Sequence, residues 1–201
     1  MSSPRSPRIS RRRLLAAGLA LPLPALVACG QEEAVTSLPP TPGCGEDEHP
    51  TLAQTEGPYF KPDSPPRTSF LGDVSGGTRF LLAGSVLTTS CQPVPAALLD
   101  VWHADPDGNY DNIGYRLRGH FFSDADGRFV LETVMPGLYP GRTRHFHVKV
   151  QAPNAPVLTT QLYFPDEPAN ARDRIFRPEL LMAVRDVRDG TEGSFDFVVV
   201  T

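Results

Sequence analysis

The sequence predicts an all-β fold, a β-sandwich of short, mostly antiparallel strands joined by long active-site loops. Two observations support this prediction. From Thr78 onward, short runs with the two-residue period of a strand are separated by Gly, Pro, Asn and Asp residues at even spacing. Helical periodicity is nearly absent, and only residues 169–176 could form a helical turn or two. Short strands with little helix are typical of a sandwich.

Eight strands are expected in this part of the chain. They lie at residues 79–87, 97–103, 120–123, 128–133, 145–151, 159–164, 181–184 and 194–200. The clearest is 145–151, where His145 and His147 alternate with apolar residues, so both imidazoles point to the face opposite the apolar side chains. The dipeptide Asp126-Gly127, between the third and fourth strands, predicts a hairpin turn.

The first 28 residues have the features of an export signal. A twin-arginine motif, SRRRLL, stands at residues 10–15, and an apolar run follows it to residue 28. Pro22 and Pro24 argue against a stable membrane-spanning helix in this run. The segment LVAC at residues 26–29 resembles a bacterial lipoprotein cleavage site. We therefore expect a periplasmic or extracytoplasmic protein that contacts the membrane only through a lipid anchor at Cys29.

The remaining chain is expected to form a flexible tether at residues 29–50, rich in Pro, Gly and acids, and one domain at residues 51–201. Because the signal holds five arginines and no acid, 14 of the 19 basic residues remain against 23 acidic ones, a net charge of about −9. Such an acidic surface excludes nucleic acid as a natural partner. Cys44 and Cys91 can form a disulfide in an oxidising compartment, the alternative being two free thiols.

Four residues form a candidate metal-binding set: Tyr110, Tyr139, His145 and His147. Imidazoles two residues apart on one strand face can bind one ion together, although two surface histidines on a half-exposed strand remain the alternative. A single tyrosine usually serves packing. Two tyrosines beside two histidines instead favour a trivalent iron, because phenolate is a hard, anionic oxygen ligand.

A second acidic pattern lies just upstream. Asp105, Asp107, Asn109 and Asp111 alternate as they would in a calcium-binding loop. The distal bidentate acid that such a loop needs is absent, so a solvated turn is the better interpretation.

Several motifs together resemble the intradiol ring-cleavage dioxygenases, a family that includes the protocatechuate and catechol dioxygenases. These are TEGPYF at 55–60, DVW at 100–102, GNY at 108–110, DGRF at 126–129, PGLYP at 136–140, RTRHFH at 142–147 and TQLYF at 160–164. They follow the order in which the family carries them. Export points to the stand-alone, secreted branch of the family.

The resemblance implies a non-haem Fe(III) bound by Tyr110, Tyr139, His145 and His147, with Tyr139 and His145 axial. It implies a catalytic role for Tyr139, which accepts a substrate proton, and for Arg142, which stabilises charge developing on the ring. Gln161 matches a position beside the site, although an ordinary strand glutamine is the alternative. The expected reaction is cleavage of a catechol or polyphenol between its two hydroxyl-bearing carbons by O2, giving a muconate-type diacid without a reductant.

Two other classes of function stay open at this point. One is an exported metal- or ligand-binding sandwich without turnover, and the other is a structural envelope protein. Two tyrosines and a displaceable ligand position favour the enzyme over both. The sequence defines neither the particular substrate nor an oligomeric state.

Overall fold

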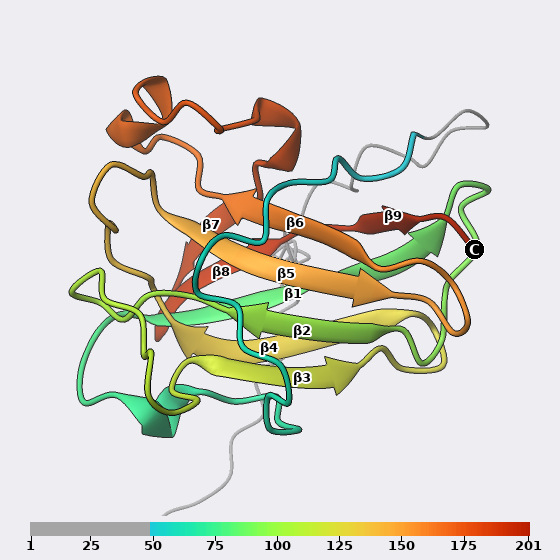
Figure 1. Cartoon of the computed structure of the whole chain (residues 1–201), viewed down its shortest axis with the longest axis horizontal. Coiled ribbons are helices and arrows are strands. Elements are labelled where there is room, and N and C mark those ends of the chain that lie inside the picture. Colours follow the sequence, from blue (N-terminus) through green and yellow to red (C-terminus); the bar gives the residue numbers. More distant parts are fainter. Residues whose placement is uncertain (1–48) are drawn as a thin grey trace, which may run out of the picture. The chain divides into compact units, whose positions relative to one another are not determined.

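The structure is a computed structural model that describes residues 49–201, and these residues form two β-sheets packed face to face (Figure 1). The smaller sheet has the order β3-β2-β5-β6 and is antiparallel throughout. Its strands are β2 (Leu98–Trp102), β3 (Arg118–Phe122), β5 (His145–Gln151) and β6 (Leu158–Tyr163). The all-β sandwich expected from the sequence is confirmed.

The larger sheet has the order β4-β1-β8-β7, and β9 pairs with the far end of β1. Its strands are β1 (Arg79–Thr88), β4 (Arg128–Val134), β7 (Ala183–Val187), β8 (Gly190–Ser194) and β9 (Phe197–Val199). Only β8 and β9 run parallel to β1. The helical content of residues 49–201 is three short 3-10 turns, η1 (Leu71–Asp73), η2 (Pro168–Ala171) and η3 (Pro178–Leu180). No helix in these residues is long and apolar enough to cross a membrane.

The core fills the space between the two sheets. Phe146, Val148 and Val150 of β5 are fully buried there, and the Phe146 ring lies 5.4 Å from the ring of Phe80 on β1. Each such side chain contributes about 1.5–3 kcal/mol by leaving water. Because the two-residue period sends these residues inward, the other face of β5 is left for the histidines.

The C-terminal strands differ from the expectation. The expected strand at 181–184 begins later, as β7, and the single strand expected at 194–200 is shorter, as β9. The sequence pattern missed β8 because Gly190 and Gly193 lower its strand propensity. Gly193 lies against the Phe80 ring, where an added Cβ would come within 2.4 Å of a ring carbon. A glycine in this strand therefore reflects close packing.

The hairpin predicted at Asp126-Gly127 is wrong. A tight turn does form there, with the Gly127 N–H donating to the Asp124 carbonyl at 3.0 Å. The strands on its two sides, however, belong to different sheets, since β3 pairs with β2 and β4 pairs with β1. Turn residues report local backbone geometry, whereas the sheet that each strand joins is decided by its buried face.

A segment that we call the strap, residues 51–67, crosses the outer face of the smaller sheet (Figure 1, cyan). It starts beside β6, where the Gln54 N–H donates to the Thr159 carbonyl at 2.8 Å, and ends beside β3, where Arg67 donates to the His120 carbonyl. Beneath the strap, His145 and His147 are only 4% and 2% exposed. The alternative of two surface histidines on a half-exposed strand is therefore wrong.

Several predictions concern residues outside the described part. The export signal, the anchor at Cys29, nearly all of the tether and Cys44 lie there. Cys91 is disulfide-bonded. Because Cys44 is not among the described residues, its pairing with Cys91 stays a prediction.

Candidate metal centre

Loops at one end of the smaller sheet bring the tyrosines to the histidines. Tyr110 follows β2, and Tyr139 lies between β4 and β5. The two loops touch at Gly108, whose φ is +87° and where an added Cβ would lie 2.3 Å from the Leu138 carbonyl oxygen. Only glycine accepts both that dihedral and that contact, so the GNY motif is a requirement of loop packing.

Three of the four predicted ligands converge on one point. The Tyr110 hydroxyl oxygen lies 3.0 Å from His145 Nε2 and 3.1 Å from His147 Nε2, and the two Nε2 atoms are 3.1 Å apart. Ligands at right angles on a metal with bonds of about 2.1 Å are themselves about 3.0 Å apart. The three atoms are thus spaced as ligands on one face of a single ion.

The protonation states of the histidines suit this arrangement. His145 Nδ1 lies 2.6 Å from the Thr143 carbonyl, which can only accept, so its proton is on Nδ1 and a lone pair remains on Nε2. Burial, followed by the charge of Arg142, lowers the pKa of His145 to about 4. Burial also lowers the pKa of His147 well below its ordinary value. Both rings are therefore neutral at pH 7, which metal binding requires.

Burial raises the pKa of the Tyr110 phenol above its ordinary value, and Arg142 and Arg118 oppose this only in part. Such a phenol ionises at neutral pH only beside a strong Lewis acid. In the described residues, no group of three or more His, Cys, Asp or Glu side chains could hold a metal. A metal at this place would therefore depend on the tyrosine oxygens, and the donor set fits a hard trivalent ion.

Tyr139 lies next to this group, with its ring 5.7 Å from that of Tyr110. Its hydroxyl is 2.7 Å from the hydroxyl of Tyr59, a strap residue whose ring stacks on Tyr110 at 4.5 Å. The hydrogen bond to Tyr139, followed by burial, raises the pKa of Tyr59. The sequence offered no signal for the contact of Tyr59 with Tyr139, because this contact depends on how separate loops meet.

Arg142 and Gln161 lie together at the edge of the cluster. Arg142 donates to Gln161 Oε1 at 2.6 Å and forms an ion pair with Asp173 at 2.8 Å. Gln161 is fully buried and donates to the Thr55 carbonyl of the strap at 2.9 Å. Asp173 also accepts the Thr143 N–H at 2.9 Å, so one carboxylate holds both Arg142 and the backbone that orients His145.

One row of cross-strand partners forms the floor of the site. In order across β3, β2, β5 and β6, its members are Arg118, Trp102, His147 and Gln161. The Trp102 ring stacks on the His147 ring at 4.9 Å, with 5° between the planes. Neither His147 Nδ1 nor Trp102 Nε1 has a hydrogen-bond partner in residues 49–201. Sequence reasoning assigned no function to Arg118, which is 2% exposed.

The acidic pattern upstream of Tyr110 forms turns, as expected. Asp105 accepts the N–H groups of Asp107 and Asn109 at 3.0 and 2.8 Å. Asp111 accepts three backbone N–H groups, those of residues 113, 114 and 116, which lower its pKa to about 2. These carboxylates stabilise the loop that carries Tyr110.

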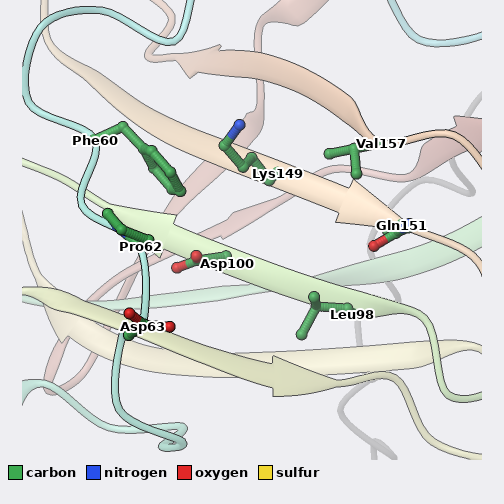
Figure 2. Close-up of a pocket in the computed structure, with 8 residues that line it drawn as sticks. All are labelled: Phe60, Pro62, Asp63, Leu98, Asp100, Lys149, Gln151 and Val157. Atoms are coloured by element: carbon green, nitrogen blue, oxygen red, sulfur yellow. The ribbon is translucent and has the colours of Figure 1, made fainter.

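A small pocket lies on the same sheet face, on the other side of the strap (Figure 2). Phe60 and Pro62 of the strap form one wall, and Asp100 and Lys149 rise from neighbouring strands. Its volume is about 220 Å³, below the roughly 300 Å³ at which ligand sites begin. Lys149 is already paired with Glu56 at 2.5 Å. The tyrosine and histidine cluster is therefore the better candidate for a functional site.

The fold and the cluster together define a class, a β-sandwich protein that presents two tyrosines and two histidines at one end of a sheet. The family model described as "Dioxygenase" matches residues 55–200. The chain belongs to this family, the intradiol ring-cleavage dioxygenases.

Two curated relatives illustrate the relationship. The chlorocatechol 1,2-dioxygenase of Rhodococcus opacus is 30% identical over 148 residues, covering 59% of this chain and 58% of that protein. The hydroxyquinol 1,2-dioxygenase of Nocardioides simplex is 30% identical over 151 residues, covering 63% of this chain and 51% of that protein. The chain thus spans about half the length of these curated relatives.

Among solved structures, the dioxygenase domain of a dioxygenase carbohydrate-binding protein fusion from the cellulolytic bacterium Streptomyces sp. SirexAA-E is 56% identical, with a TM-score of 0.74. The alignment covers 76% of this chain and 99% of that domain.

Proposed function

We propose that this protein is a non-haem Fe(III)-dependent intradiol dioxygenase that opens a catechol-type ring between its two hydroxyl-bearing carbons. One observation carries the proposal: the Tyr110 oxygen and the two histidine Nε2 atoms lie 3.0–3.1 Å from one another, with the Tyr139 phenol beside them. Family membership supports it independently. Tyr110, Tyr139, His145 and His147 are the proposed ligands.

The chemistry that a bound ferric ion supplies is Lewis acidity, which ionises phenols and makes a chelated catechol reactive toward O2. Tyr139 is the proposed acceptor of one catechol proton. Its oxygen already lies 2.7 Å from the Tyr59 hydroxyl, so Tyr59 can donate to Tyr139 when that oxygen carries charge. Proton uptake by Tyr139 would offset one of the two negative charges that a catechol acquires when both of its hydroxyls are deprotonated.

Arg142 is the proposed stabiliser of negative charge on the ring. Asp173 and Gln161 hold its guanidinium at two nitrogens, so the cation is in place before the reaction starts. Gln161 thereby positions Arg142. Arg142→Leu should leave iron and catechol binding largely intact and slow turnover about a hundredfold, which corresponds to about 3 kcal/mol.

We further propose export by the twin-arginine signal and a lipid anchor at Cys29. An extracytoplasmic enzyme would meet catechols or polyphenols from outside the cell. The solved relative with 56% identity supports this, because it comes from a cellulolytic bacterium and is fused to a carbohydrate-binding protein. Replacing Arg11 and Arg12 by Lys should trap the precursor in the cytoplasm, and normal export of that variant would refute the twin-arginine route.

A metal- or ligand-binding module without turnover is the second candidate, because the same cluster could hold an ion that does no chemistry. Metal analysis and a visible spectrum of the purified protein test whether the cluster holds ferric iron. The proposed site predicts stoichiometric iron and a red-brown colour from phenolate-to-iron charge transfer, with a shift when catechol is added without oxygen. A colourless protein with stoichiometric zinc would refute the ferric site.

A further inference from the structure

Arg118 is a fully buried arginine on the floor of the site whose side chain the proposed reaction does not use. It begins β3 and pairs in register with Trp102, which in turn pairs with His147. Six arginines in residues 49–201 have a carboxylate partner, but Arg118 is not among them. Burying a cation without a carboxylate in ion-pair contact is costly, so the contacts that its guanidinium makes call for an explanation.

The Arg118 guanidinium makes three hydrogen bonds, and all of them go to backbone carbonyls. Nε and one terminal nitrogen donate to the Asp111 carbonyl at 3.2 and 2.9 Å, and the other terminal nitrogen donates to the Tyr59 carbonyl. These two carbonyls come from separate segments, the strap and the loop after β2. The planar, forked guanidinium can reach both at once, whereas a lysine ammonium is a single point.

Both carbonyls belong to residues next to Tyr110, one in the chain and one in space. Asp111 follows Tyr110 directly in the chain, and the Tyr59 ring stacks on the Tyr110 ring at 4.5 Å with 16° between the planes. Pinning both backbones therefore fixes the position and the tilt of the Tyr110 ring. That ring must be held closely, since its oxygen meets two histidine nitrogens at 3.0–3.1 Å.

We propose that Arg118 is the positioning residue for the ligand Tyr110, acting by holding the carbonyls of Tyr59, whose ring stacks on Tyr110, and of Asp111, which follows it in the chain. This inference rests on the proposed function, because it takes Tyr110 to be a metal ligand. Outer contacts that orient a ligand change metal affinity by about 10–100-fold when they are lost. Arg118 would do this through the backbone of these two residues.

The test uses the full-length protein loaded with ferric iron, and its readouts are the visible spectrum and the iron dissociation constant. Arg118→Gln should lose the Tyr110 part of the charge-transfer band, so its spectrum should match that of Tyr110→Phe, and it should bind iron at least about tenfold more weakly. The double variant should bind iron no more weakly than Tyr110→Phe alone. Arg185→Gln is the control and should keep the wild-type spectrum, because Arg185 is 44% exposed and lies on β7 in the other sheet.

A purely structural role for Arg118 gives a different pattern. Arg118→Gln would then show the wild-type spectrum with a lower unfolding temperature, or a loss that adds to that of Tyr110→Phe, and either result overturns the inference. If Arg118→Gln does not fold, Arg118→Lys decides, since a lysine can reach one of the two carbonyls. An intermediate spectrum supports the positioning role, and a wild-type spectrum refutes it. A colourless wild-type protein would instead refute the proposed function, and this inference with it.

Discussion

Asp173→Asn is the substitution whose effect follows most directly from the geometry of the site. The Asp173 carboxylate pairs with Arg142 at 2.8 Å and accepts the N–H groups of Thr143 and Ile175 at 2.9 and 3.1 Å. The Asp173 side chain is 2% exposed and that of Arg142 is 19% exposed. Removing one partner of a buried pair costs about 3–5 kcal/mol, because the other charge stays buried.

We expect a loss of about 3 kcal/mol in the free energy of unfolding, at the low end because asparagine still offers one oxygen. Turnover of catechol should fall about tenfold, since Arg142 would lose a contact that holds it in place. Urea unfolding of the metal-free protein at pH 7 measures the first effect. The exposed pair Arg185–Glu192 provides the control, and Glu192→Gln should cost less than about 1 kcal/mol.

The pH dependence of Asp173→Asn has a definite sign. Burial raises the pKa of Asp173, but the hydrogen bonds from Thr143, Ile175 and Arg142 outweigh it and leave this pKa below its ordinary value. The stabilisation by the carboxylate is therefore complete above pH about 4 and is lost as the pH falls through the folded-state pKa. The two proteins should converge in stability in acid. A loss at pH 7 no larger than that of the control would refute the reasoning.

Three further predictions concern Gly57 of the strap, the proposed ligand Tyr139 and the buried His103. Gly57 has φ +73°, and an added Cβ would lie 3.2 Å from the His147 ring, so Gly57→Ala should cost about 1–2 kcal/mol and weaken iron binding. Gly76→Ala is the control: its φ is +89° but nothing lies near the added Cβ, so it should show the cost of the backbone strain without a contact to a side chain. Tyr139→Phe should keep most of the iron, because three protein ligands remain, yet bind catechol more slowly in stopped-flow mixing, because one proton acceptor is lost. Full loss of iron would contradict this prediction. Burial lowers the pKa of His103 to about 4, so protonation favours the unfolded chain and stability should fall by up to about 3 kcal/mol between pH 6.5 and 4. His103→Asn should flatten that part of the stability curve, and an unchanged slope would contradict the assignment.

The strand that carries the histidines was predictable because one local rule decides it. The period of two separates His145 and His147 from the buried side chains, and β5 has the expected bounds, His145–Gln151. The strand β8 could not be predicted, since the reason for Gly193 is its contact with Phe80 on another strand. The period of two also could not predict that both histidines are buried, because the strap that covers them comes from residues about ninety positions earlier.

For the site, the sequence predicted that tyrosines and histidines form one cluster. The structure adds the contacts that hold their side chains in place. Tyr110 and Tyr139 stood out beside the histidines and within family motifs. The role of Arg118 depends on the register of four strands and on two loops meeting at one guanidinium. No spacing in the sequence reports such a contact, and Arg118 looks there like any charged residue at the start of a strand.

The central claim is intradiol cleavage, and the product of catechol turnover tests it most directly. The iron-loaded protein would be mixed with catechol under isotopically labelled O2, without a reductant, and the product analysed by mass spectrometry. The proposed function predicts a muconate-type diacid that carries both atoms of one dioxygen molecule. A semialdehyde, which forms by cleavage beside the two hydroxyl-bearing carbons, would contradict the assignment, and absence of turnover with iron bound would favour the binding module.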